Sequence, residues 1–276
     1  MYAVSDAERR YLEDGIEQGY RNDGRGCLDY RPMEIRVGVL PTANGSAKLT
    51  CGDTDLIIGV KCDLGEPPGL PDRGAVCVNV QMSASVAPSF VSRDGESWAQ
   101  DLSRTLEKLC TDASVVDLSA LCLYPGKFAW TVYVDVLVLN SGGNLLDAVS
   151  LGMRAALKNT LIPQVVVFEA EEDGEDHKIG INDNPQVGMR FPCDDLPVCV
   201  TVTMIGGRFL LDISKEEEAC AEAVLCAAVD SQGRCRGIQK LRPGSIGITT
   251  MPELLQAACR TGALLLKSLD EALASQ

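Results

Sequence analysis

Residues 129–159, AWTVYVDVLVLNSGGNLLDAVSLGMRAALKN, are the most informative stretch of this 276-residue sequence. The part up to Leu139 is almost wholly apolar, which predicts a strand in the middle of a sheet that is covered on both faces. Gly142 and Gly143 follow and predict a tight turn. The segment from Asn144 to Asn159 is then expected to form a long helix.

The same order of elements occurs twice along the chain. A helix is predicted at 95–110, and strands at 33–40, 46–51, 55–62, 75–82, 118–123 and 164–169. In the second half, strands are predicted at 196–205, 208–213, 224–230 and 235–241, before a closing helix at 252–273. Strands that precede single long helices, twice over, predict an α+β (α/β-like) fold with internal pseudo-symmetry. No linker divides residues 1–276, so we expect one unit.

The composition is that of a globular protein, with 46% hydrophobic and 23% charged residues. Residues 1–26 are polar and charged, so we expect no secretory signal. No apolar run approaches the length of a membrane span, so we expect a soluble intracellular protein with no membrane partner.

Cysteine is abundant, with twelve residues, but none of them form a C-x-x-C pair, and His177 is the single histidine. A zinc site needs closely spaced ligands in matching pairs. We therefore expect neither a metal site nor any cofactor, and interpret the cysteines as buried, small apolar side chains.

The net charge of −14 argues against a protein that grips nucleic acid alone, because phosphate contacts come from Lys and Arg. Part of the excess is a local run of acids at 169–176, which we interpret as a solvated loop. The charge still allows a subunit that contributes a few arginines to a surface shared with partners.

Two local patterns could carry chemistry. The Gly142–Gly143 turn opens a helix, whose free N–H groups suit a phosphate, although many strand–helix turns have the same form without binding one. Asp212, the 216–218 glutamates and Glu222 follow a strand and could bind Mg²⁺ or act as acid and base. A polar turn that starts a helix explains them equally well. No G-x-S-x-G, Walker or G-x-G-x-x-G motif is present.

Several strings, taken in order, carry a resemblance that runs nearly from end to end. They are D23-G24-R25-G26 with D29-Y30-R31, G45-S46-A47 with G52-D53-T54-D55, Y133-V134-D135-V136, G142-G143-N144-L145-L146-D147-A148, A155-A156-L157 with N159-T160, and Asp212 with E216-E217-E218-A219-C220. The sequence resembles the RNase PH family, and within it the non-catalytic RNase PH-like ring subunits of the eukaryotic RNA exosome. The resemblance implies an RNase PH fold, similar to domain 2 of ribosomal protein S5, with helices packed on mixed sheets. Its two lobes would span 28–165 and 194–260.

Departures from that family pattern decide the expected activity. Active relatives place a Ser or Thr and then a phosphate-binding Arg after their paired glycines, whereas this sequence has Asn144 and Leu145. The family's acidic pair corresponds to Asp212 and Glu218, and a later aspartate corresponds to Val224. A leucine supplies no charge-assisted hydrogen bond to hold phosphate against the anionic RNA backbone. We therefore predict no catalytic residues, no bound metal and no phosphorolysis.

The resemblance also implies partners and a role. The expected function is that of a non-catalytic structural subunit that threads single-stranded RNA to a separate 3′-to-5′ exonuclease, in rRNA maturation and mRNA turnover. Its partners would be other RNase PH-like ring subunits, cap proteins with S1 and KH domains, that exonuclease and the RNA itself. We expect it in the nucleus, including the nucleolus, and in the cytoplasm.

Arginines are the candidates for contact with RNA, because channels for single strands track phosphates with scattered positive charge. Arg93 and Arg104 lie in or beside the 95–110 helix, where relatives place basic RNA-contacting residues, but ordinary surface residues would look the same. Arg21, Arg25 and Arg31 are instead expected to be structural, and to pair with acids such as Asp23 and Asp29 or meet a neighbouring subunit.

Two other functions stay open on the sequence alone. The first is an active phosphate-dependent 3′-to-5′ exoribonuclease, against which Leu145 is the main feature. The second is an unrelated Mg²⁺-dependent metabolic enzyme that uses Asp212 and its neighbouring glutamates.

Overall fold

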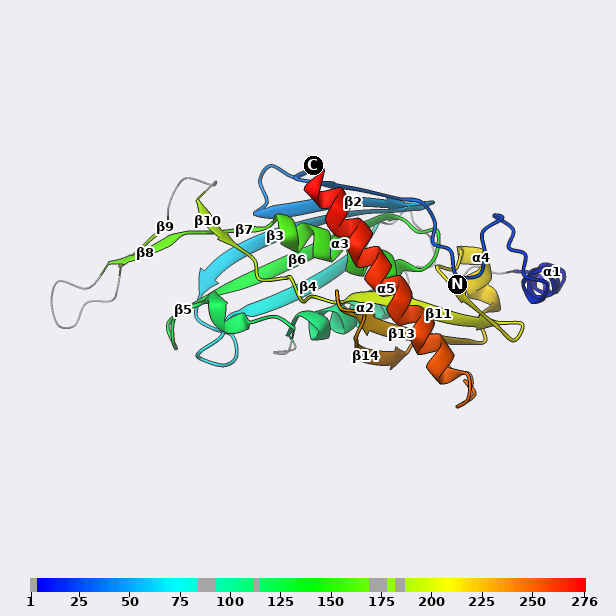
Figure 1. The fold of residues 1–276 in the computed structure, drawn as a ribbon. Helices are drawn as coiled ribbons and strands as arrows, with labels where there is room; N and C mark the ends of the chain where they lie inside the picture. Colours follow the sequence, from blue (N-terminus) through cyan, green and yellow to red (C-terminus); the bar gives the residue numbers. More distant parts are fainter. Residues whose placement is uncertain (1–3, 84–92, 112–114, 169–177, 182–186) are drawn as a thin grey trace.

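The computed structural model describes residues 4–83, 93–111, 115–168, 178–181 and 187–276 (Figure 1). The helices are α1 (Asp6–Glu17), α2 (Arg93–Thr111), α3 (Leu145–Asn159), α4 (Lys215–Cys220) and α5 (Met251–Ala274), with a 3₁₀ turn η2 (Leu118–Leu121). The strands are β1 (Met33–Val37), β2 (Gly45–Cys51), β3 (Thr54–Gly65), β4 (Ala75–Met82), β5 (Cys122–Tyr124), β6 (Phe128–Asn140), β7 (Leu161–Pro163), β8 (Val165–Phe168), β9 (Lys178–Ile181), β10 (Gly188–Arg190), β11 (Val198–Ile205), β12 (Arg208–Leu211), β13 (Ala223–Val229) and β14 (Cys235–Lys240).

The larger sheet is mixed and has the order β1-β2-β3-β6-β4, with β5 paired to β6. β1, β2, β3 and β6 are antiparallel neighbours, whereas β4 runs parallel to β6. A parallel pair needs a crossover connection, and α2 lies in the connection between β4 and β6. In the register, Val136 of β6 lies between Ile58 of β3 and Val80 of β4, and all three side chains are buried.

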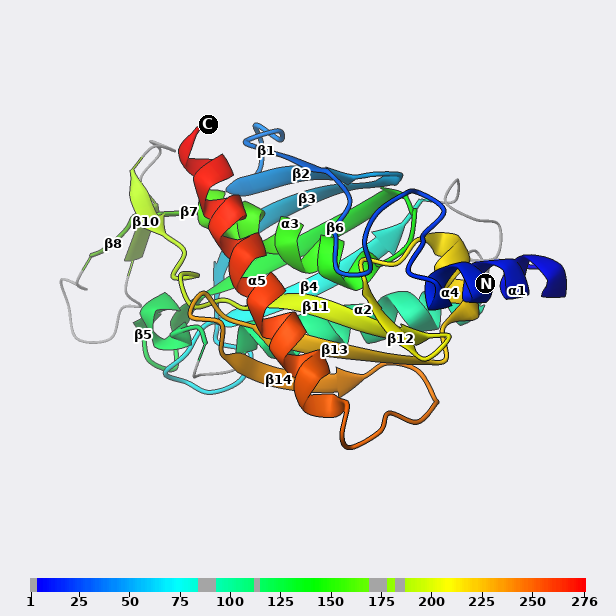
Figure 2. The ribbon, with the colours of Figure 1, turned by 45° about the vertical axis from the view of Figure 1, so that its right-hand side comes forward.

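A second, antiparallel sheet has the order β12-β11-β13-β14. α3 lies between the two sheets, because it packs on β2 and β3 on one side and on β11 on the other. Its residues 145–157 are all buried, which explains why apolar residues occur on every side of this helix, with Asp147 and Arg154 as its buried charged residues. α5 covers β11 and β13 and crosses the molecule diagonally (Figure 2).

The long helices predicted at 95–110, 144–159 and 252–273 are confirmed, each to within two residues at either end, as α2, α3 and α5. The hairpin predicted around 231–233 is confirmed as β13 and β14. The α+β architecture is also confirmed, with the mixed pairing confined to the larger sheet. The acidic run at 169–176 and His177 lie outside the described residues.

Two local predictions are wrong. β6 is not covered on both faces: its burial alternates, and Tyr133 and Leu137 are 43% and 39% exposed, whereas the side chains that alternate with them are buried on the face where α2 and α3 pack. The predicted strand at 118–123 begins instead as η2 and becomes extended only at β5. Asp117 caps that turn by accepting a hydrogen bond from the Ser119 N–H at 3.0 Å, which favours a helical turn locally.

The cysteines match the apolar interpretation in part. Six are buried, and burial raises the pKa of the Cys62 and Cys110 thiols to about 12, so both stay protonated and inert. Cys235 is exposed and is an exception. No helix among the described residues is both long enough and apolar enough to cross a bilayer.

Candidate functional site at the glycine turn

The glycine turn before α3 lies against the end of β12 and the start of α4. Gly143 has a φ of 102°, and a Cβ there would come within 2.6 Å of the Ile213 carbonyl oxygen. Only glycine combines that backbone conformation with that close approach. Asn144 then precedes α3 in the left-handed region, with a φ of 49°. The paired glycines are therefore explained by chain packing at this junction.

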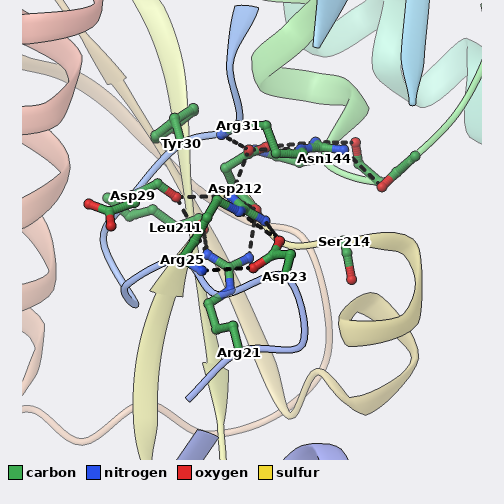
Figure 3. Close-up of polar contacts among 12 residues, drawn as sticks. Arg21, Asp23, Arg25, Asp29, Tyr30, Arg31, Asn144, Leu211, Asp212 and Ser214 are labelled. Atoms are coloured by element: carbon green, nitrogen blue, oxygen red, sulfur yellow. Dashed lines mark hydrogen bonds and ion pairs between the residues drawn. The ribbon is translucent and has the colours of Figure 1, made fainter. Parts of the chain in front are cut away.

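Asp212 follows β12 directly and lies at the centre of the site (Figure 3). Arg31 binds both oxygens of its carboxylate, with Nη2–Oδ1 and Nε–Oδ2 distances of 2.7 and 2.8 Å. Arg25 adds a contact of 3.1 Å from Nη1 to Oδ2. Burial by itself would raise the pKa of Asp212, but the hydrogen bonds and charge of Arg31 hold it below its usual value. Asp212 is thus a charged, fully engaged carboxylate.

The Arg31 guanidinium has almost no donor left for a ligand. Besides Asp212, it donates to the carbonyl oxygens of Gly142 and Gly143 at 2.9 and 3.0 Å. A guanidinium has five N–H groups, and the four bonds to Asp212, Gly142 and Gly143 use four of them. Burial lowers the pKa of Arg31, but the bond to Asp212 and its charge raise it by more.

A second buried ion pair lies beside the first. Arg21 donates to both carboxylate oxygens of Glu217, at 2.9 and 2.7 Å, and its side chain has no exposed surface. It also donates to the backbone oxygens of Leu211 and Asp212. Glu217 is held from its own side by Ser214, with which it forms the capping box of α4. The segment around residues 21–31 is therefore fixed to the second sheet by arginines.

The start of α3 is already occupied by a carboxylate. The Asn144 N–H donates to Oε1 of Glu218 at 2.9 Å. Burial raises the pKa of Glu218, although this hydrogen bond and the charge of Arg242 act against the rise. An anion at a helix N-terminus is stabilised by the helix dipole, and here the chain supplies that anion itself.

Asp147 connects both halves of the molecule within the core. Its carboxylate accepts hydrogen bonds from the Tyr30 hydroxyl (2.7 Å), Asn144 Nδ2 (2.9 Å), and both the backbone N–H (2.9 Å) and the hydroxyl (2.6 Å) of Thr201 in β11. Burial raises the pKa of Asp147 to about 6, against the effect of these donors. Burial and the charge of Asp147 likewise raise the pKa of Tyr30 well above its ordinary value.

The residues singled out in the sequence converge only in part. Asn144, Asp212 and Glu218 meet at the turn, where Asn144 Nδ2 also donates to Asp212 at 3.2 Å. Leu145 is 5% exposed and belongs to the apolar core, and its side chain has no hydrogen-bond donor for a phosphate. Val224 is buried in β13 at the register position opposite Thr203.

The arrangement of acids does not favour a metal ion. Asp212 has both oxygens bound to arginine, and Glu218 is bound to the Asn144 N–H. Across the part of the chain that the structure describes, no three His, Cys, Asp or Glu side chains are grouped as metal ligands. The site is a closed network of charges that neutralise one another.

The arginines expected to contact RNA do not join this site. Arg104 is exposed on α2 and pairs with Asp101 at 3.2 Å. Arg93 begins α2, but its side chain lies outside the described residues. Both assignments stay predictions.

Sequence reasoning found the arginines of the N-terminal segment but only one of their acidic partners. The pairing of Arg25 with Asp23 is confirmed at 2.6 Å, whereas Asp29 accepts from the arginines through its backbone oxygen. The partners Asp212 and Glu217 follow far along the chain, and no local spacing signals them. The bonds of Asp147 to Tyr30 and Thr201 were missed for the same reason, although Tyr30 and Asp147 both lie within recognised motifs.

Comparison with known proteins identifies this class of fold. Residues 29–163 match domain 1 of the 3′ exoribonuclease family, RNase PH, and residues 195–261 match domain 2. These matches take in most of the chain, which therefore belongs to the RNase PH family.

Individual relatives show which members of the family this chain resembles. The chain is 34% identical over 263 residues to the exosome complex component Rrp42 of Thermococcus kodakarensis, covering 95% of this chain and 94% of the relative. It is 29% identical to a putative exosome complex exonuclease RRP42 of Dictyostelium discoideum, over 99% and 98% of the two chains. A chain of the Archaeoglobus fulgidus exosome, solved with RNA bound to the active site, has a TM-score of 0.81 at 32% identity, covering 95% of this chain and 98% of that chain.

We predict that Arg31→Leu lowers the free energy of unfolding by about 3–5 kcal/mol, because it leaves Asp212 buried without its main partner. Urea denaturation would measure the loss. Arg36→Leu is the matched control, since its pair with Glu34 is exposed and should contribute less than about 1 kcal/mol. Equal losses in both variants would contradict the central role of the Arg31–Asp212 pair.

We also predict a pH dependence that is specific to Asp147. The folded chain takes up a proton at Asp147 near pH 6, and the unfolded chain only near pH 4, so the folded state binds more protons between these values and loses stability as the pH rises through them. Relative to Asp147→Asn, the native chain should gain about 2 kcal/mol of unfolding free energy from pH 7 down to pH 4. A difference between the two proteins that stays constant with pH would contradict this.

Proposed function

We propose that this chain is a non-catalytic ring subunit of the RNA exosome, similar to exosome component seven. The relatives support membership of an exosome core, since they are exosome components or chains of an archaeal exosome. The non-catalytic role is supported mainly by the closed charge network of Arg31, Asp212 and Glu218 around the glycine turn. Leu145 takes the place of a phosphate-binding arginine, and Glu218 occupies the helix N-terminus where an anionic substrate would bind.

The physical reason is electrostatic. Phosphorolysis brings inorganic phosphate against the RNA backbone, and two anions approach each other only where positive charge offsets their repulsion. Arg31 contacts the turn, and it is bound to Asp212 and to the carbonyl oxygens of Gly142 and Gly143. Among the described residues, Arg21, Arg25 and Arg31 are thus held in ion pairs that join the N-terminal segment to the second sheet, rather than left open to a substrate.

In this role the chain supports 3′-to-5′ RNA processing and degradation, including rRNA maturation and mRNA turnover, by helping to thread single-stranded RNA to a separate nuclease. Other RNase PH-like subunits would complete the ring, with S1 and KH cap proteins above it, in the nucleus, the nucleolus and the cytoplasm. The net charge of −14 suits a subunit that shares an RNA path with more basic partners.

The first test is phosphorolysis. The purified chain, alone and with its ring neighbours, should release no nucleoside diphosphates from single-stranded RNA in phosphate buffer, because Leu145 supplies no charge to hold the phosphate. Thin-layer chromatography of labelled RNA measures the product, and an active RNase PH in the same buffer is the positive control. Diphosphate release that tracks with this chain would establish the active exoribonuclease instead.

The second test concerns the RNA path. We expect Arg93 and Arg104 to contact phosphates, so reversing both to Glu in the assembled ring should weaken RNA binding and reduce the slope of log affinity against log salt by about 2. Reversing Arg36 and Lys61, which lie on the larger sheet away from α2, is the matched control. An unchanged slope and unchanged nuclease protection of the threaded RNA would remove both arginines from the path.

A further inference from the structure

The segment 231–252 differs in charge from the rest of this acidic chain. It holds four basic residues, Arg234, Arg236, Lys240 and Arg242, and neither Asp nor Glu. The whole chain has 39 acidic and 25 basic residues, so a stretch of this length with only basic charges is the opposite of the chain's overall balance. The segment comprises the turn before β14, β14 itself, the loop that leads to α5 and the first two residues of that helix.

β14 is the edge strand of the second sheet. It lies at the margin of the molecule in both ribbon views (Figures 1 and 2). The Leu241 N–H donates inward to the Val224 carbonyl at 2.9 Å. Because inward and outward groups alternate along a strand, the backbone N–H groups of Ile238 and Lys240 point away from β13. They form the start of an edge that can receive another strand.

The positive charge of this edge is only partly neutralised. Arg234 and Arg236 share one buried carboxylate, Asp230, each with an Nε–Oδ2 distance of 2.8 Å. Two cations against one anion leave a net positive charge, and the Arg234 side chain is still 53% exposed. Lys240 is exposed and donates to the Gly244 carbonyl, which carries no formal charge. The edge therefore favours an acidic partner.

Exposed apolar side chains accompany these charges. Ile238 is 51% exposed, Leu241 38% and Ile248 89%. Charges by themselves protect an edge strand from unwanted pairing, but that protection does not require exposed isoleucines. Grooves for single-stranded RNA combine positive charge with aromatic platforms for the bases, and residues 231–252 contain no aromatic residue. The combination fits an extended polypeptide better than RNA.

We propose that β14 and the loop that follows it up to Thr250, which we call the β14 edge, dock an extended, Asp/Glu-rich segment of a partner protein. The segment adds as a strand along the outward N–H and C=O groups. Its acidic side chains meet Arg234 and Lys240, and its apolar side chains meet Ile238 and Ile248. The inference stands on the charge and exposure of this chain alone, so it does not depend on whether the partner belongs to an exosome ring.

A zero-length carbodiimide crosslink tests the contact directly, because it joins a lysine amine only to a carboxylate that touches it. The full-length chain is purified with its native complex, crosslinked and analysed by mass spectrometry. Lys240 should be linked to an Asp or Glu of another protein. Hydrogen exchange at Ile238 and Lys240 should also be at least tenfold slower in the complex than in the isolated chain.

Charge variants give the second measurement. Arg234→Gln with Lys240→Gln should reduce about tenfold the amount of the partner, once identified by the crosslink, that co-purifies with the chain without crosslinker. Arg36→Gln with Lys61→Gln removes the same charge from the larger sheet and should leave that amount unchanged. Lys240→Gln alone leaves the ion pairs of Asp230 with Arg234 and Arg236 intact. This single variant therefore tests the same loss of charge if the double variant does not fold. The proposal is overturned if Lys240 forms no crosslink to protein, if only RNA slows exchange at the edge, or if both double variants behave alike.

Discussion

The ion pair between Arg31 and Asp212 is the constraint on which the rest of the site depends. It joins three parts of the chain: the N-terminal segment, the glycine turn before α3 and the end of β12. Two buried charges are stable only when their geometry is good and their remaining hydrogen-bonding groups are satisfied. Here the guanidinium binds the carboxylate through two bonds and the turn through two more. The same pairing occupies both oxygens of the Asp212 carboxylate and two N–H groups of the Arg31 guanidinium.

Asp147 extends this network into the layer between the sheets. α3 is apolar nearly throughout, and Asp147 is the buried carboxylate by which it bonds to Thr201 in the second sheet and to Tyr30 in the N-terminal segment. Apolar packing sets the spacing of the layers but is not directional. The hydrogen bonds of Asp147 are directional, and they fix how α3 lies on β11.

The distribution of charge has a functional meaning beyond its net value. Arg31 and Arg21 near the turn form ion pairs with Asp212 and Glu217, so their charges add little to the electrostatic potential at the protein surface. Lys240 and Arg234 on the β14 edge remain exposed. A chain with a strongly negative net charge can thus still present a local basic edge to a partner.

The sequence by itself determined the elements whose signals are local. Apolar periodicity located α2 and α5, the glycine pair and the apolar run after it located α3, and Leu145 in place of the family's arginine supported the prediction of an inactive chain, because these signals depend on residues close together in the chain. Only the tertiary structure decided that β6 has an open face and that Arg21 and Arg31 pair with Glu217 and Asp212. Those facts depend on which surfaces and charges meet after the chain folds, and contacts across more than 180 residues leave no periodic trace in the sequence.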